Sequence, residues 1–223
     1  LYFKQYTFHR SLKKELDPLT LEKANKVMKN PGYSFGHIDF KNFNKHVEDF
    51  RTVYNKGWAK HAGVNPISER QAKLYMDSMK KILDKRLLWF AYYKDQAVGF
   101  FLMIPELNQI FKHLNGSYNL FSKLKILYIR KFKSLTKALG LLFGVVPEHQ
   151  GKGLESAIIT AFSEIAYRKD FEYTDLEMNW IGDFNPRMIH VVEQIGATVK
   201  KVHHTYRYIL DPEVDFKRAD ILQ

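Results

Sequence analysis

The sequence contains no cysteine, and this absence excludes several kinds of structure and chemistry. A disulfide scaffold, a metal site built on thiolates and a cysteine nucleophile all need a residue that the 223-residue chain lacks. A reducing compartment suits such a composition, and we expect a cytoplasmic protein. Apolar residues make up 45% of the chain and aromatic residues 15%, so a sizeable core is predicted and a disordered chain is excluded.

Long apolar runs are also missing. A membrane-spanning helix needs about 20 consecutive apolar residues, and the longest uncharged apolar run of note covers only Ala138 to Val146. We therefore expect no bilayer span. The chain opens with Leu1-Tyr2-Phe3-Lys4, which is neither a start nor a signal sequence, so we interpret it as a fragment of a longer protein.

Acidic residues are absent between Glu106 and Glu148, which concentrates part of the net charge of +11 in one stretch. The seven basic residues there are Lys112, Lys123, Lys125, Arg130, Lys131, Lys133 and Lys137. Such a field attracts a phosphorylated cofactor, an acidic substrate, nucleic acid or an anionic membrane surface, and a plain solvated face fits equally well. No nucleic-acid motif accompanies it, so nucleic acid is the least expected of these partners.

Hydrophobic periodicity predicts an α+β fold with a mixed sheet. From residue 33 the predicted order is a strand, two helices, a hairpin of two strands, a basic insertion over 107–137, a strand, a glycine turn, a helix, a strand, a helix and one or two final strands. Hairpins together with crossovers argue against a purely parallel sheet. We expect a strand and helix appendage over 1–30, a main domain over 31–212 and a tail over 213–223.

The glycine turn is the first candidate site. Gln150-Gly151-Lys152-Gly153 follows a predicted strand and opens a predicted helix. Glycines at a helix N-terminus let a phosphate approach free backbone N–H groups, although many such turns hold glycine for tight geometry only. Leu154 follows Gly153 where an ATP-binding loop has Lys-Ser or Lys-Thr, so that motif is excluded.

Two motifs in register resemble the GCN5-related N-acetyltransferase family. Val146-Pro147-Glu148-His149-Gln150-Gly151-Lys152-Gly153-Leu154 resembles its acyl-CoA motif, Gln/Arg-x-x-Gly-x-Gly/Ala. Downstream, Asn185-Pro186-Arg187-Met188-Ile189-His190-Val191-Val192-Glu193-Gln194-Ile195-Gly196-Ala197 is similar to its second signature, Asn-x-x-Ala-Ile-x-Leu-Tyr-x-Lys-x-Gly-Phe. The resemblance covers residues 33–210, and it implies a mostly antiparallel sheet that splays between its fourth and fifth strands.

The resemblance also implies a coenzyme site. Backbone N–H groups of the turn would bind the pyrophosphate of coenzyme A, and the preceding strand would offer its edge to the pantetheine amides. By this resemblance the turn residues are Gln150, Gly151, Lys152, Gly153 and Leu154, and the strand residues are Gly144, Val145 and Val146. Asn185 is assigned either to the thiol-proximal arm of the cofactor or to the cap of its own helix.

Two positions depart from the family pattern. Glu155 replaces the last small residue of the first motif, and Val192 replaces the tyrosine that protonates the departing thiolate. Tyr206 and Tyr208 on the predicted final strand are substitute hydroxyls, and Tyr206 is our candidate. A general base is also needed for direct attack by an amine. Glu177 is our candidate, and pairing with a basic residue is the competing interpretation.

The resemblance implies an acyl-CoA-dependent N-acyltransferase, most simply one that transfers acetyl from acetyl-CoA to an amine acceptor. The basic stretch adds an acidic acceptor as one option. Two alternatives stay open: a non-catalytic acyl-CoA sensor or scaffold, and a transferase that takes aminoacyl groups from tRNA. No metal is implied. We interpret insertion 107–137 as a substrate-side lid or a homodimer contact. Residues 3–10 loosely parallel residues 202–209, which suggests the tail of an upstream copy.

Overall fold

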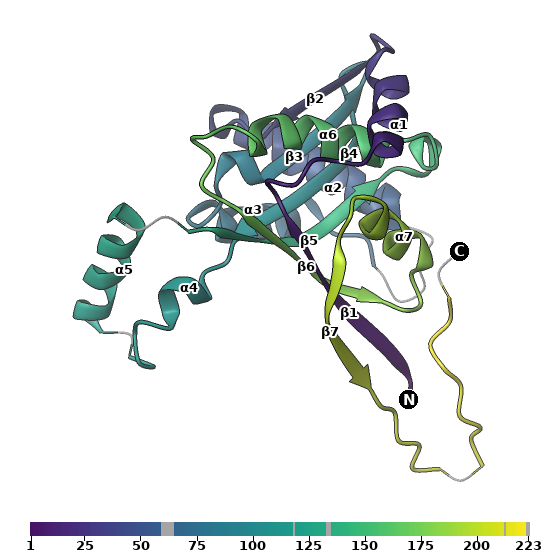
Figure 1. Cartoon of the computed structure of the whole chain (residues 1–223). Coiled ribbons are helices and arrows are strands. Elements are labelled where there is room, and N and C mark those ends of the chain that lie inside the picture. Colours follow the sequence, from purple (N-terminus) through teal and green to yellow (C-terminus); the bar gives the residue numbers. More distant parts are fainter. Residues whose placement is uncertain (59–64, 118, 133–134, 212, 222–223) are drawn as a thin grey trace.

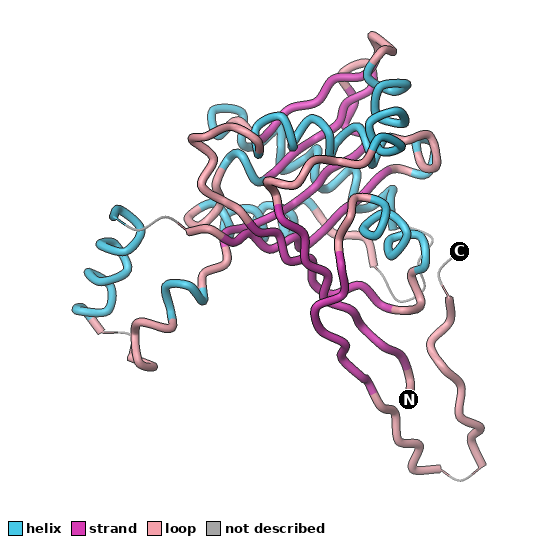
Figure 2. Tube along the Cα trace, viewed as in Figure 1, coloured by secondary structure: helices cyan, strands magenta, loops and turns pink. Residues whose placement is uncertain are grey.

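The computed structural model describes residues 1–58, 65–117, 119–132, 135–211 and 213–221 as one α+β unit built on a seven-stranded sheet (Figures 1 and 2). The strands are β1 (Phe3–Ser11), β2 (Tyr33–His37), β3 (Leu88–Tyr93), β4 (Gln96–Pro105), β5 (Lys137–Val145), β6 (Asp175–Gly182) and β7 (Thr198–Thr205). The α-helices are α1 (Pro18–Met28), α2 (Phe43–Trp58), α3 (Glu69–Lys80), α4 (Asn108–Phe111), α5 (Leu120–Phe132), α6 (Leu154–Ala166) and α7 (Pro186–Gln194).

Local sequence signals account for most of these boundaries. Ser68 and Gln71 form a capping box at the start of α3, because the side chain of each residue accepts the backbone N–H of the other. Lys94 and Asp95 both have positive φ, the geometry that a two-residue hairpin turn requires between β3 and β4. The predicted hairpin is therefore confirmed.

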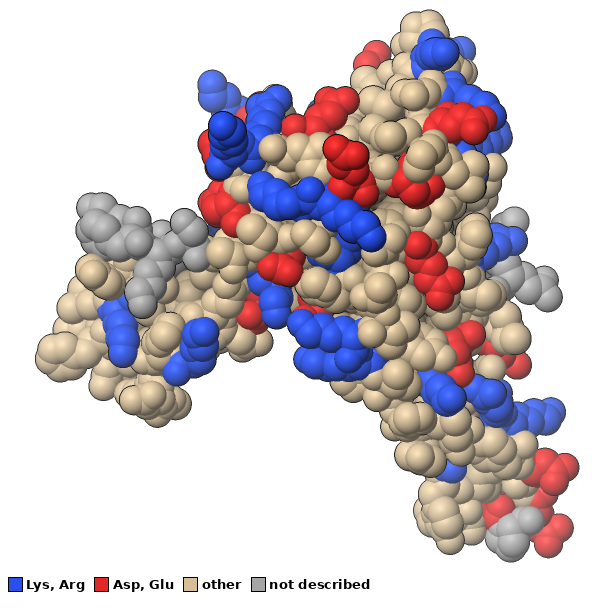
Figure 3. Space-filling view, viewed as in Figure 1, with Lys and Arg blue, Asp and Glu red and all other residues tan. Residues whose placement is uncertain are grey.

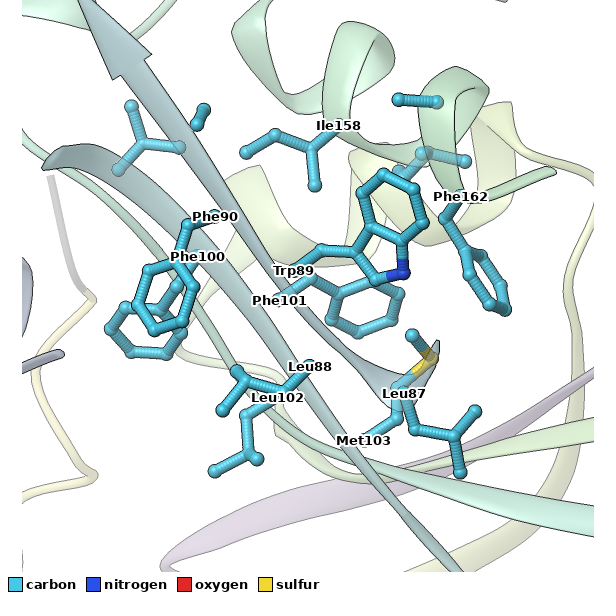
Figure 4. Packing of buried hydrophobic residues seen from close by; sticks show 14 of the residues in the cluster. Leu87, Leu88, Trp89, Phe90, Phe100, Phe101, Leu102, Met103, Ile158 and Phe162 are labelled. Atoms are coloured by element: carbon cyan, nitrogen blue, oxygen red, sulfur yellow. The ribbon is translucent and has the colours of Figure 1, made fainter. Parts of the chain in front are cut away.

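The main core lies on both faces of β3 and β4 (Figure 4). On one face the rings of Trp89 and Phe101 pack edge-on against Phe162 of α6. On the other, Phe100 packs against Phe50 of α2. These two strands read as nearly continuous apolar runs because helices cover them from both sides.

The sheet order is β2-β3-β4-β5-β6-β1-β7, and its one parallel pair is β5 with β6 among the described residues. Pairing between them runs only from Lys137 opposite Asp175 to Gly140 opposite Met178. Beyond that point β5 continues to Val145 and β6 to Gly182 without pairing to each other. The predicted splay between the fourth and fifth strands of the main domain is confirmed.

The first 30 residues do not stand apart from the main domain. Strand β1 lies inside the sheet, antiparallel to β6 on one side and to β7 on the other. Helix α1 packs against α6. The prediction of an appendage over 1–30 is therefore wrong for the fold, because sequence periodicity shows that a strand exists but not which strands pair with it.

Helices α4 and α5 form an arm that stands off the sheet (Figure 1). The arm leaves β4 after Pro105 and returns at Lys137, the first residue of β5. The glycine turn follows the opposite end of β5, about 30 Å away for a nine-residue strand. The arm therefore does not cover the glycine turn. Among the described residues, no helix has the length and apolarity needed to cross a membrane.

Candidate active site

Strand β5 directs the backbone groups of alternate residues toward the gap between β5 and β6. Val146 donates its N–H to the Val98 carbonyl of β4 at 2.9 Å, and Gly144 pairs with Phe100 on the same strand. Because backbone groups alternate sides along a strand, those of Val145 point away from β4 and toward the gap. Of the three strand residues that we predicted as coenzyme contacts, Val145 is the one whose backbone faces the gap.

The glycine turn reaches the start of α6 through two left-handed residues. Gly151 has φ +68° and Gly153 has φ +87°, and Gly153 is the N-cap of α6. The N-cap residue is a glycine, so it has no side chain that could accept a first-turn N–H of α6. The turn therefore presents free donors and the positive end of a helix dipole, the combination that binds a phosphate.

The two glycines are needed for different reasons. A Cβ on Gly151 would meet nothing within 4 Å, whereas a Cβ on Gly153 would lie 3.0 Å from the carbonyl oxygen of Lys23. Helix α1 thus closes one side of the turn at Gly153 and leaves the other side open at Gly151. The Lys152 side chain in the turn is exposed, whereas the Leu154 side chain is fully buried.

Two polar contacts fix the turn against the sheet. The Gln150 amide donates to the Val145 carbonyl at 2.9 Å, which leaves the Val145 N–H as the free backbone group at the gap. The Tyr33 hydroxyl lies 2.6 Å from Nδ1 of His149. Burial, together with the nearby Lys152 ammonium, lowers the pKa of His149, so this ring is neutral at pH 7. Both contacts hold the turn in place before any ligand arrives.

Glu155 sits in the first turn of α6, half-buried. Burial raises the pKa of its carboxyl, opposed by its own backbone N–H and by Lys23. An ionised carboxylate in the first turn of α6 repels an incoming phosphate, so Glu155 is a position where the chain departs from a favourable phosphate site.

Asn179 marks the point where β6 parts from β5. It follows Met178, the last residue of β6 that pairs with β5. Its Oδ1 is buried and has no hydrogen-bond partner among the described residues. An unpaired buried acceptor costs stability and calls for an explanation, and a ligand N–H is the simplest. Asn179 and Glu177 are two residues apart on β6, and no pattern in the sequence indicates that the Asn179 amide oxygen lacks a partner.

Glu177 lies among three lysines. Its carboxylate is 3.5 Å from the Lys137 ammonium, 3.4 Å from that of Lys200 and 3.7 Å from that of Lys201. Burial pushes the pKa of Glu177 up, but the three ammonium groups outweigh it and hold the pKa below its ordinary value. The competing interpretation, pairing with basic residues, describes these contacts. The carboxylate joins β5, β6 and β7 and stays ionised at neutral pH.

The other two predicted residues lie apart from the gap. Tyr206 follows β7, which β1 separates from β6, and its side chain is 75% exposed with the His204 ring as its aromatic neighbour. The Asn185 side chain accepts the Met188 N–H at 3.1 Å, so it caps its own helix. Val192 is fully buried. The structure thus joins the turn to Val145 through Gln150, places Asn179 where β6 leaves β5, and sets Tyr206 on the far side of β1.

Three solved structures with a similar fold are described as GCN5-related N-acetyltransferases or as a GNAT protein. A GCN5-related glucosamine N-acetyltransferase region of a fungal multidomain β-N-acetylglucosaminidase matches 90% of this chain and 20% of its own, with TM-score 0.54 and 12% identity. A GCN5-related N-acetyltransferase from Sphaerobacter thermophilus matches 90% of this chain and 50% of its own, with TM-score 0.52 and 13% identity. A tandem GNAT protein of clavulanic acid biosynthesis matches 89% of this chain and 50% of its own, with TM-score 0.51 and 13% identity. At this level of identity the likeness shows the fold.

Two curated relatives are more similar in sequence. The bacterial ceramide synthase of Caulobacter vibrioides is 26% identical over 183 residues, which is 80% of this chain and 47% of that protein. Protein YghO of Escherichia coli is 27% identical over 173 residues, 76% of this chain and 44% of that protein. The chain therefore spans about half the length of the curated relatives that it matches. No family model matches the sequence.

Proposed function

We propose that this chain, which has the GCN5-related N-acetyltransferase fold, is an enzyme that transfers an acyl group from a coenzyme A thioester to an amine. The observation that carries the proposal is the gap between β5 and β6, which opens beside a helix N-terminus without a side-chain cap. A diphosphate fits the turn, and an extended chain with amide groups fits the exposed edge of β5. No other nucleotide motif in the sequence competes for this place.

The likeness to a ceramide synthase supports a finer proposal about the substrates. A ceramide is an amide of a long-chain amino alcohol, so its synthesis from an acyl thioester is the reaction proposed here. We propose a long-chain amino alcohol as acceptor in place of the unspecified amine, and a fatty acyl group as the alternative to acetyl.

In the proposed reaction the turn holds the diphosphate and the Val145 N–H binds an amide oxygen of the pantetheine arm. Asn179 Oδ1 accepts an N–H from that arm or from the acceptor. The amine nitrogen attacks the thioester carbonyl carbon, the carbon–sulfur bond breaks, and coenzyme A leaves as a thiolate. The amine proton passes through water to a base and the thiolate takes a proton, giving an amide and free coenzyme A.

Glu177 is proposed as that base because its depressed pKa keeps it ionised at neutral pH. The three ammonium groups that lower its pKa also make Glu177 a weak base. It would accept the proton through water, and protonation would weaken its ion pairs with the lysines. Tyr206 is proposed as proton donor only if the segment after β7 moves toward the gap. If both roles fail, water supplies and removes the protons.

Two measurements on the same protein test the proposal. Calorimetric titration with acetyl-CoA and with palmitoyl-CoA measures binding. Release of thiol is then followed with a panel of amines that includes a long-chain amino alcohol, a short amino alcohol and a phosphorylated amine. Thioester binding with release of thiol supports the enzyme. Binding without release for every amine supports the sensor, and absence of thioester binding contradicts both.

Replacing Glu155 with glutamine is expected to tighten coenzyme A binding about three- to tenfold at pH 8, where the carboxylate is ionised and repels the diphosphate. Burial raises the pKa of Glu155, so the native carboxyl loses its charge as the pH falls, and the advantage of E155Q shrinks toward pH 5. Comparing both proteins at each pH removes the titration of the ligand itself.

The control for this prediction is E164Q, an exposed glutamate near the far end of α6. It removes the same charge from the same helix and should leave affinity within about twofold. Equal affinities for E155Q and the native chain at pH 8 would show that Glu155 does not face the ligand.

Asn179→Leu is expected to lower kcat/KM about 10- to 100-fold while the melting temperature stays the same or rises. The substitution removes a buried acceptor that has no partner among the described residues, so the free chain loses nothing, whereas the bound ligand loses a hydrogen bond. Thiol release and thermal unfolding are measured on the same preparation. T160V is the matched control. Thr160 Oγ1, in the middle of α6, is also a buried atom without a hydrogen-bond partner among the described residues, and the kinetics of T160V should not change.

A further inference from the structure

The arm of α4 and α5 has a small core of its own. Ile110, Leu114 and Ile129 are buried, with exposed fractions of 9% or less, yet they are not part of the main core cluster. Helices α4 and α5 contact each other. The inner face of α5 therefore packs within the arm, and its outer face is exposed.

That outer face is apolar. Five residues of α5 and one of α4 expose between 46% and 79% of their surface: Leu120, Phe121, Leu124, Leu127, Tyr128 and Phe111. At 100° per residue the five α5 positions fall within one third of the helix circumference. Large side chains gathered on one helix face and exposed to this degree mark an interaction site.

Positive charge borders this face. Lys123 and Lys125 flank it on either side of the α5 helix wheel, and the whole stretch between Glu106 and Glu148 lacks an acidic residue. On the side of the molecule in Figure 3, the arm shows tan and blue surface and no red. An apolar face bordered by lysines suits an anionic lipid surface, where the side chains enter the headgroup region and the ammonium groups meet the lipid phosphates.

We propose that α5 docks the protein on an anionic membrane surface, with its axis in the plane of the interface. Charge complementarity decides between this occupant and a second copy of the chain, because two such arms face to face would bring their lysines together. The docking needs no acyl transfer, so it stands or falls separately from the proposed function. It would hold the chain where long-chain lipids are found.

Sedimentation with vesicles tests the proposal. The 223-residue chain is mixed with vesicles of phosphatidylcholine alone or of phosphatidylcholine with 30% phosphatidylglycerol. We expect binding to the anionic vesicles that is at least tenfold stronger than to the neutral ones and that weakens between about 0.05 and 0.5 M salt. F121S/L124S should lower binding at least tenfold, and K112E/K125E should do the same at low salt only.

The matched control is L74S/Y75S, which changes two exposed apolar residues on α3, away from the arm. Its binding should equal that of the native chain, and circular dichroism verifies that all variants keep their helices. Equal binding to both vesicle types, or equal binding by F121S/L124S and L74S/Y75S, would overturn the proposal. So would failure to bind vesicles together with a dimer in sedimentation velocity that F121S/L124S dissociates.

Discussion

Replacing Gly153 with alanine is expected to weaken coenzyme A binding about 100-fold. A Cβ there would lie 3.0 Å from the Lys23 carbonyl oxygen, and neither α1 nor the turn can absorb this contact without moving. Movement of the turn displaces the first N–H groups of α6, and these hydrogen bonds to a charged phosphate depend steeply on distance. The positive φ of 87° adds about 1–2 kcal/mol of backbone strain in the free protein.

Gly151→Ala separates the effect of the Cβ contact from the effect of backbone strain. Gly151 also has positive φ, so alanine there carries a similar backbone cost, but its Cβ would meet nothing within 4 Å. We expect a loss of stability of about 1–2 kcal/mol and a change in affinity of less than about tenfold. Calorimetric titration of both variants, with thermal unfolding alongside, gives the two quantities. If G151A and G153A bind coenzyme A equally well, the turn is not the diphosphate site.

Local patterns in the sequence predicted the elements because helix and strand formation depends on neighbouring residues. The capping box at Ser68, the Asn185-Pro186 start of α7 and the glycine turn before α6 each specify a boundary through contacts within a few residues. The glycine turn precedes α6 as predicted, and the other two boundaries arise from the same kind of local contact. The splay between β5 and β6 came from the family resemblance, since no local pattern encodes it.

The position of β1 is the part of the fold that the sequence did not predict. Its partners β6 and β7 lie about 170 to 200 residues away in the chain, and a strand pattern carries no label for its neighbour. Of the segments 3–10 and 202–209, which loosely parallel each other, residues 3–6 pair with residues 202–205 as antiparallel strands. The upstream copy that this parallel suggests stays a prediction.

The geometry of the proposed site was easier to predict for the backbone than for the side chains. The roles proposed for Gly153 and Val145 rest on main-chain geometry, which a motif specifies directly. Glu177 was chosen because a carboxylate on that strand face suits a base, but Lys200 and Lys201 reach it from β7, and their approach depends on the order of strands in the sheet. Asn179 attracts attention only when its buried oxygen is seen to lack a partner in the described part of the chain.

Arg10 shows how firmly the first strand is built into the fold. Its side chain is 3% exposed and donates to three backbone carbonyls, those of Ile195, Lys14 and Glu15. Ile195 lies at the end of α7, where a cation also complements the helix dipole. One guanidinium therefore joins β1 to α7 and to the segment that leads into α1.

Arg10→Met is expected to lower the free energy of unfolding by about 3 kcal/mol, because methionine fills the volume but donates to none of the three carbonyls, of which the Ile195 carbonyl is buried. For a chain of this length that corresponds to a fall in melting temperature of about 6–12 °C. Thermal and urea unfolding followed by circular dichroism measure both. R187M is the control, because Arg187 is exposed on α7 and its loss should change stability by less than about 0.5 kcal/mol. A stability change for R10M no larger than that of R187M would mean that β1 is not held through Arg10, and the N-terminal strand would then depend on its sheet pairing alone.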